Sequence, residues 1–258
     1  MQKSDVEAAA HWAGLASPSI VIHRLDGTGS INVHIDDRRA LYPASMIKVP
    51  LAAAVFSLVE SGALRLDQRI TVASTNMTTN DKPSPFVAGY QGPLLQYLEL
   101  MITRSDNVAT NQLFDVAGRE QATQIVKSMG LELTAFHRKL SGSEPLIVDP
   151  QATGRNTHPA ADAALLFEMI ATDAIPFASQ LRQILSRQEW NDQLPTGLRP
   201  GDRFAHKTGA TDEVSHDGGL LDTREGPSYI LVVYTGLPST PDNDRRFGAF
   251  MRAVRPLL

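Results

Sequence analysis

A serine and a lysine at helical spacing open a long apolar stretch, in the segment Ser45-Met46-Ile47-Lys48. On a helix, side chains three residues apart lie on one face and can meet. A serine hydroxyl becomes a nucleophile when a neighbouring lysine, uncharged in a partly desolvated site, accepts its proton. The chain has six lysines, and Lys48 is the only one with a serine three positions before it. Taken alone, this spacing still favours a simpler alternative, a surface lysine on an amphipathic helix.

Two further motifs with polar and charged side chains follow, Ser105-Asp106-Asn107 and Lys207-Thr208-Gly209. Alone, the first favours a helix N-cap, because all three residue types are preferred there. The second, alone, favours an exposed strand end with a bulge glycine. The three motifs together, in this order, indicate an active site.

The ordered set S-x-x-K, S-D-N and K-T-G resembles the class A β-lactamase family and its relatives among penicillin-recognising serine hydrolases. The surrounding residues are similar too, with Leu194-Pro195 and Gly197-Leu198 before the third motif and His216-Asp217-Gly218-Gly219 after it. The resemblance covers essentially the whole chain. It implies a hydrolase that opens a β-lactam amide through an acyl-enzyme.

Four residues would carry out the acylation. Ser45 would attack the carbonyl carbon, and Lys48 is the nearest group to accept its proton. Ser45, at a helix start, would also offer its backbone N–H to the oxyanion. The resemblance implies that Ala210 supplies the second oxyanion donor and that Ser105 passes a proton to the leaving nitrogen.

Substrate binding would involve the second and third motifs. Asn107 resembles the amide that binds the substrate's acylamino carbonyl group. Lys207 and Thr208 would hold the substrate carboxylate by charge and by hydrogen bonding, with Gly209 beside them.

Two histidines flank the third motif, His206 and His216. Many class A enzymes place an arginine for the substrate carboxylate on or near the strand after K-T-G, and that strand carries His216 here. Weaker affinity for penicillins, or a different natural substrate, is therefore expected. We interpret both histidines as structural or substrate-lining.

The resemblance also requires a glutamate on the loop after S-D-N, where it activates the water that hydrolyses the acyl-enzyme. Arg138 resembles the arginine that anchors this loop, and Leu140 stands where the glutamate is expected. Glu144 is the candidate replacement, although it requires a shifted loop, and Val148 replaces an expected asparagine. A solvated loop residue is an equally good interpretation of Glu144. The sequence thus predicts complete acylation machinery and doubtful deacylation.

Several functions remain open at this point. The first is a β-lactamase, and the second is a D-alanyl-D-alanine peptidase, esterase or amidase with slow or absent β-lactamase turnover. A third is a penicillin-binding sensor that stays acylated. A structural domain without catalysis would require all three motifs to be coincidences.

The spacing of apolar residues and turn signals predicts an α+β fold, with an antiparallel sheet from both chain ends and a mostly helical lobe from the middle. One domain, 1–258, is expected to contain a sheet lobe, 1–42 with 200–258, and a helical lobe, 43–199. Strands are predicted at 19–25, 31–35, 67–72, 203–210, 216–221 and 228–235. Helices are predicted at 5–15, 45–64, 93–103, 108–117, 120–129, 160–171, 177–185 and 243–254.

Composition excludes several classes of protein. The 258 residues have a net charge of −4 and no basic cluster, so no nucleic-acid face is expected. No apolar run is long enough to span a bilayer, and residues 1–10 do not resemble a signal peptide. With no cysteine and no H-E-x-x-H motif, neither a disulfide nor a metal site is expected. We expect a monomer without a cofactor that acts on a small β-lactam, acyl-peptide or ester; its compartment, cytoplasm or export as a mature form, stays open.

Overall fold

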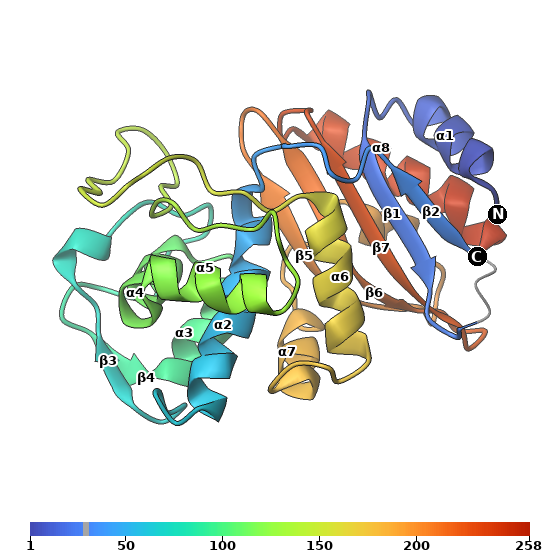
Figure 1. Ribbon diagram of the computed structural model, residues 1–258. Helices are drawn as coiled ribbons and strands as arrows, with labels where there is room; N and C mark the ends of the chain where they lie inside the picture. Colours follow the sequence, from blue (N-terminus) through green and yellow to red (C-terminus); the bar gives the residue numbers. More distant parts are fainter. Residues whose placement is uncertain (28–30) are drawn as a thin grey trace.

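A five-stranded antiparallel sheet dominates the computed structural model, which describes residues 1–27 and 31–258 (Figure 1). The strand order is β2-β1-β7-β6-β5. The first two strands come from the N-terminal part of the chain and the other three from the C-terminal part, with bounds β1 Ser19–Arg24, β2 Asn32–Ile35, β5 Arg203–Ala210, β6 Ser215–Asp222 and β7 Ser228–Thr235. This arrangement confirms the predicted α+β class and the sheet formed from both chain ends. The sequence Asp26-Gly27-Thr28-Gly29 between β1 and β2 predicts a turn, and it lies partly outside the described residues.

Helices cover both faces of the sheet and form a group beside it (Figure 1). Helix α6 packs on one face, α1 and α8 cover the other, and α2 to α5 form the neighbouring group with a small sheet of β3 and β4. The bounds are α1 Lys3–Trp12, α2 Lys48–Glu60, β3 Arg69–Thr71, β4 Gln91–Pro93, α3 Leu94–Thr103, α4 Asn107–Ala117, α5 Arg119–Ser128, α6 Ala160–Ala171, α7 Ala178–Leu185 and α8 Pro241–Val254. The division into lobes at residues 42 and 200 stays a prediction.

The middle strands are buried on both faces, which explains the unbroken apolar sequence of β7. Ile230 and Val232 belong to the core shared with the helices of the middle of the chain. Leu231 and Val233 belong to a second core with α1 and α8. Because successive strand side chains point to opposite faces, one strand contributes to both cores.

Helix α2 is buried on nearly all sides, as its apolar sequence predicts, and every residue of 48–56 is buried. Its predicted start at residue 45 was wrong. A 3₁₀ turn, η1 Ala44–Ile47, comes first, and the α-helix begins at Lys48. Pro50 is then the third helical residue, where a backbone N–H has no intrahelical acceptor, so the helix continues through it.

Two other helix starts also differ from the predictions. The helix predicted at 5–15 covers Lys3–Trp12, and its N-cap is Gln2, whose backbone N–H donates to the Asp5 carboxylate at 2.7 Å. Pro93, predicted at the first helical position, is the N-cap of α3. Shifts of one or two residues are common at helix ends, where the terminal backbone groups lack intrahelical partners.

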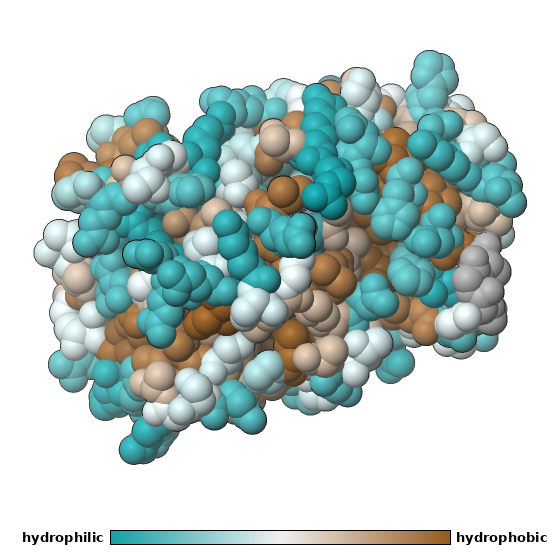
Figure 2. Space-filling model, in the orientation of Figure 1, coloured by the Kyte–Doolittle hydropathy of each residue, from teal (hydrophilic) through white to brown (hydrophobic). Residues whose placement is uncertain are grey.

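Polar residues cover most of the face seen in Figure 2, and apolar residues reach the surface only in patches between them. Within 1–27 and 31–258, no helix combines the length and the apolar composition required to cross a membrane.

Candidate active site

A cleft of about 970 Å³ beside the end of β5 brings most of the predicted site together. Residues from segments that are far apart in the sequence line it, among them Ser45, Ser105, Asn107, Glu144, Thr208 and Ala210. Lys48 and Lys207 are fully buried, and each donates a hydrogen bond to a cleft-lining residue.

Ser45 is the second residue of η1, which packs closely against β5. Ala44, just before it, has φ of +47°, a conformation that L-residues seldom adopt. Gly209 permits the contact, since a Cβ there would lie 2.9 Å from the Pro43 carbonyl oxygen and 3.1 Å from Met46 Cγ. The glycine of the third motif therefore serves a close approach that fixes Ser45 beside the strand; it is not a bulge.

The Lys48 amine lies among three oxygen atoms supplied by the second motif. Its Nζ donates to the Ser105 carbonyl oxygen at 2.6 Å, to Ser105 Oγ at 3.1 Å and to Asn107 Oδ1 at 2.8 Å. Ser105 has φ of +59°, and strain of this kind is common at functional sites. The strained backbone directs both oxygen atoms of Ser105 to Lys48.

Burial favours the uncharged form of Lys48. Desolvation, followed by the charge of Lys207, holds the pKa of Lys48 well below its usual value, against the opposing effect of Asp106 and Asp81. An uncharged amine can accept the proton of a serine hydroxyl, which a charged one cannot. The environment is therefore that of a general base.

The second motif is both an N-cap and part of the site. Asp106 Oδ1 accepts the Ala109 N–H at 2.8 Å and caps α4. The residues on either side contact Lys48, and Asn107 Nδ2 donates to the Thr79 carbonyl oxygen at 3.2 Å. The interpretation of this motif as a helix N-cap was therefore right for Asp106 only.

Lys207 is the second buried lysine of the site. Its Nζ donates to the Thr208 carbonyl oxygen at 2.8 Å. Burial lowers the pKa of Lys207 to about 7, although the charges of Asp217 and Asp81 raise it. Its charge is thus present below neutrality and lost above it.

This titration predicts an alkaline limb in the acylation rate. We expect the second-order rate constant for acylation by penicillin G to fall between pH 7 and 9, because uncharged Lys207 cannot pair with the substrate carboxylate. Arginine stays charged over this range, so Lys207→Arg should remove the limb. The measurement is the adduct formation rate from pH 5 to 9; an identical limb in both proteins would exclude Lys207 as its cause.

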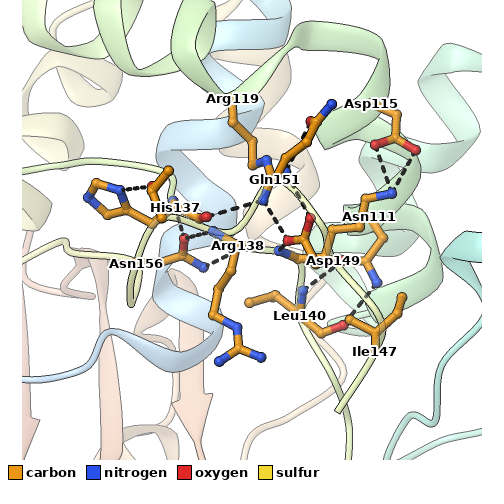
Figure 3. Close-up of polar contacts among 12 residues, drawn as sticks. Asn111, Asp115, Arg119, His137, Arg138, Leu140, Ile147, Asp149, Gln151 and Asn156 are labelled. Atoms are coloured by element: carbon orange, nitrogen blue, oxygen red, sulfur yellow. Dashed lines mark hydrogen bonds and ion pairs between the residues drawn. The ribbon is translucent and has the colours of Figure 1, made fainter.

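Leu140 lines the cleft and is held through its backbone. Its N–H donates to Asn111 Oδ1 at 2.8 Å, and its carbonyl oxygen accepts from Asn111 Nδ2 at 2.9 Å (Figure 3). The residue is only 5% exposed. An apolar side chain thus occupies a rigidly positioned part of the cleft wall.

A family model described as the beta-lactamase enzyme family matches residues 4–254. The chain belongs to this family. Among curated proteins it is similar to the extended-spectrum beta-lactamase PER-1 of Pseudomonas aeruginosa, 26% identical over 74% of this chain and 66% of that protein. It is also similar to beta-lactamase L2 of Stenotrophomonas maltophilia, 30% identical over 78% of this chain and 67% of that one. The chain thus spans about two thirds of the length of these two family members.

Solved structures show the same fold over nearly the whole length. PBP-A superposes with a TM-score of 0.85 at 26% identity, covering 98% of this chain and 95% of that one. A leucine-to-glutamate mutant of PBP-A, an acyl-enzyme complex with penicillin G, superposes with a TM-score of 0.84 at 27% identity over 98% and 94% of the two chains. A beta-lactamase from Sphaerobacter thermophilus shares the fold at 24% identity, with a TM-score of 0.84 over 100% of this chain and 98% of that one.

The arginine that anchors the loop is Arg119, and the prediction of Arg138 was wrong (Figure 3). Arg119 Nη1 donates to Asp149 Oδ2 at 2.6 Å, and Nη2 donates to Oδ1 at 2.9 Å. Asp149 also accepts the Lys139 N–H at 2.8 Å. Within the described residues, the Arg138 guanidinium has no hydrogen bond or ion pair, and Figure 3 shows it pointing away from this network. A pair thirty positions apart leaves no local signal in the sequence.

We expect Asp149→Asn to lower the free energy of unfolding by about 3 kcal/mol, because it leaves a mostly buried guanidinium without its carboxylate. Urea denaturation measures this change. Asp67→Asn is the matched control, since it disrupts an Arg–Asp pair that is exposed on both sides and should alter stability little. Equal effects of the two substitutions would contradict an anchoring role.

Glu144 lies on the cleft but is exposed, and its carboxylate accepts the Leu146 N–H at 3.0 Å. This position agrees with either interpretation from the sequence, a shifted base or a solvated loop residue. Its role in deacylation stays a prediction.

Both histidines that flank the third motif, His206 and His216, are buried and structural, and neither lines the cleft. His206 pairs with Asp217 through Nδ1 at 2.7 Å. His216 Nε2 donates to the Tyr42 carbonyl oxygen at 2.8 Å, and its ring stacks on Tyr234. Burial lowers the pKa of His216 to about 4, so the ring is uncharged at neutral pH and ties the segment before Ser45 to β6.

Sequence reasoning missed Trp190 as part of the cleft wall. Its indole Nε1 donates to the Arg104 carbonyl oxygen at 3.1 Å, beside Ser105, and the Lys82 ammonium lies 4.4 Å from the ring centroid. Only tertiary contacts bring these segments together. In the part of the chain that is described, no three His, Asp or Glu side chains are arranged to hold a metal ion.

Proposed function

We propose that this protein is a class A-type serine hydrolase in which Ser45 opens a β-lactam ring and becomes acylated. The observation that carries the proposal is the fully buried Lys48, whose hydrogen bonds to Ser105 and Asn107 bring the second motif to it. Burial lowers the pKa of Lys48 and so favours its uncharged form, an effect that is absent for a solvent-exposed lysine.

The steps follow from the groups around the cleft. Uncharged Lys48 takes the proton of Ser45 Oγ as this oxygen bonds to the lactam carbonyl carbon. Backbone N–H groups of Ser45 and Ala210 stabilise the oxyanion. The C–N bond then breaks, and the proton passes from Lys48 through Ser105 Oγ, 3.1 Å from Nζ, to the leaving nitrogen. Lys48 is then uncharged again, and Ser45 carries the acyl group as an ester.

Binding of the acyl substrate would use the remaining residues. Asn107 holds the acylamino carbonyl group, while Lys207 and Thr208 hold the carboxylate, with Gly209 keeping their strand close to Ser45. The PBP-A mutant, which has a similar fold, forms an acyl-enzyme with penicillin G, and this supports a β-lactam as the acylating substrate.

Deacylation would be slow, because Leu140 provides no base at a position that lines the cleft. This observation favours a second candidate, a peptidase or esterase whose β-lactam adduct is long-lived. Glu144 is the remaining acid that could activate water from the same loop.

An intact-mass time course with penicillin G tests the proposal, with Ser45→Ala as the control. We expect an adduct of one penicillin on the wild-type protein, persisting for many minutes, and none on the variant. Rapid loss of the adduct with product formation would instead indicate an efficient β-lactamase and favour Glu144 as base. No adduct on the wild-type protein, or an adduct on Ser45→Ala, would overturn the acylation proposal.

A further inference from the structure

Two arginines and a tyrosine line one part of the cleft wall, and one of the arginines has no partner. The guanidinium carbon of Arg155 lies 4.5 Å from the centroid of the Tyr42 ring, and its Nη2 donates to Glu213 Oε2 at 2.6 Å. The Arg138 guanidinium has no hydrogen bond or ion pair within the described residues. One positive charge on this wall is therefore unpaired.

The buried amide of Asn156 holds the two arginines near each other through the backbone. Its Oδ1 accepts the Arg138 N–H at 3.0 Å, and its Nδ2 donates to the Arg138 carbonyl oxygen at 3.0 Å (Figure 3). Asn156 directly follows Arg155 in the chain and is only 1% exposed. Figure 3 shows the Arg138 guanidinium extending away from the network that anchors the loop. Like charges that a fold brings near each other favour a bound ion of opposite charge.

Tyr42 contributes a second group without a partner. Its hydroxyl has no hydrogen bond among the described residues, and burial raises the pKa of the phenol, so the O–H stays protonated. The charges of Arg138 and Arg155 lower this pKa, and the charge of Glu213 raises it, so all three lie near the hydroxyl. Guanidinium and phenol groups both donate hydrogen bonds, and a carboxylate accepts from two donors at once.

Other carboxylates line the cleft but belong to different parts of it. Asp192 and Asp244 are next to Gln193, whose Nε2 donates to Asp244 Oδ1 at 2.9 Å. Neither is among the charges that act most strongly on the Tyr42 hydroxyl; the one carboxylate in that group is Glu213, which Arg155 neutralises. The unpaired arginine therefore gives this part of the wall a net positive charge.

This part of the wall lies where the acyl side chain of a bound substrate would extend. In the proposed complex Thr208 holds the carboxylate and the Ala210 N–H binds the carbonyl oxygen, so the substrate follows the direction of β5. Its acylamino side chain would then pass Ala210 and approach the turn that carries Glu213, where Arg155 pairs with this residue and contacts the Tyr42 ring.

We propose that Arg138 and Tyr42 form a subsite for a carboxylate carried on the acyl side chain of the substrate. The preferred substrate would then be a dianion, with one carboxylate at Lys207 and Thr208 and the second at the opposite end of the acyl compound. The inference rests on the proposed function, because the second carboxylate belongs to the molecule that acylates Ser45.

Two penicillins that differ in one group provide the test. α-Carboxybenzylpenicillin carries the second carboxylate, and its α-carbamoyl analogue has nearly the same shape without the charge. The quantity measured is the second-order rate constant of adduct formation by intact mass at pH 6, where Lys207 is mostly charged. We expect the carboxylate probe to react about tenfold faster than the carbamoyl probe with the wild-type protein, equivalent to about 1.4 kcal/mol.

Variants of the two donors separate their contributions. Arg138→Gln should lose most of the preference, and it should fold because the contacts of Asn156 are to the backbone. Arg138→Lys keeps the charge and should retain part of the preference. Tyr42→Phe removes only the hydroxyl and should reduce the preference about threefold. Arg65→Gln is the matched control, since it removes an exposed guanidinium outside the cleft and should retain the full preference.

Equal rates for the two probes with the wild-type protein, or a preference that persists in Arg138→Gln, would overturn the subsite. If penicillin G forms its adduct and the two probes react equally, the proposed function stands and only the subsite falls. No adduct with penicillin G or with either probe would overturn the proposed function and the subsite together.

Discussion

Replacing Lys48 by methionine is expected to slow acylation of Ser45 by penicillin G by about a thousandfold, within the range for loss of a general base. Methionine approximates the buried aliphatic chain and removes only the amine. The amine is the group that contacts both Ser105 and Asn107, so its loss also removes the route by which a proton reaches the leaving nitrogen. Substrate binding through Lys207 and Thr208 should persist.

The measurement is the rate of adduct formation, with near-ultraviolet circular dichroism to show that the fold is retained. Lys127→Met is the matched control, because Lys127 is an exposed lysine in the last turn of α5 and should leave the rate unchanged. A Lys48→Met protein that folds and acylates within tenfold of the wild-type rate would remove Lys48 from the mechanism.

Replacing Leu140 by glutamate is expected to speed hydrolysis of the penicillin G adduct by about a hundredfold or more. The side chain at this position lines the same cleft as Ser45, and its backbone is fixed by Asn111 on both sides. A carboxylate there would act on water beside the acyl ester. Because the position is only 5% exposed, burial should raise the pKa of the new carboxylate and favour its action as a base.

Single-turnover decay of the adduct measures this change. Leu140→Gln is the control, because it has the same shape as glutamate and cannot accept a proton, so its adduct should persist as in the wild-type protein. Equal decay rates of the two variants would mean that the loop does not bring this side chain to the ester.

The sequence alone predicted much of the fold, because its signals are local. Alternation and apolar runs located β1, β5, β6 and β7, and the buried character of α2 followed from its unbroken apolar composition. Three short motifs in order identified the residues that meet at the cleft. Boundaries were less certain, as at Gln2, Pro50 and Pro93, because capping and 3₁₀ geometry depend on which neighbouring group provides the hydrogen bond.

Only the tertiary structure decided how the site is supported and what else it contains. The choice of Arg119 over Arg138 depends on a contact with Asp149 across thirty residues, and nothing in the spacing of either arginine indicates it. Asp192 and Asp244 likewise come together through Gln193 from segments that are far apart in sequence. Local sequence determines which side chains could react and which segments are helices or strands, whereas charge pairing and burial depend on distances that exist only after the chain has folded.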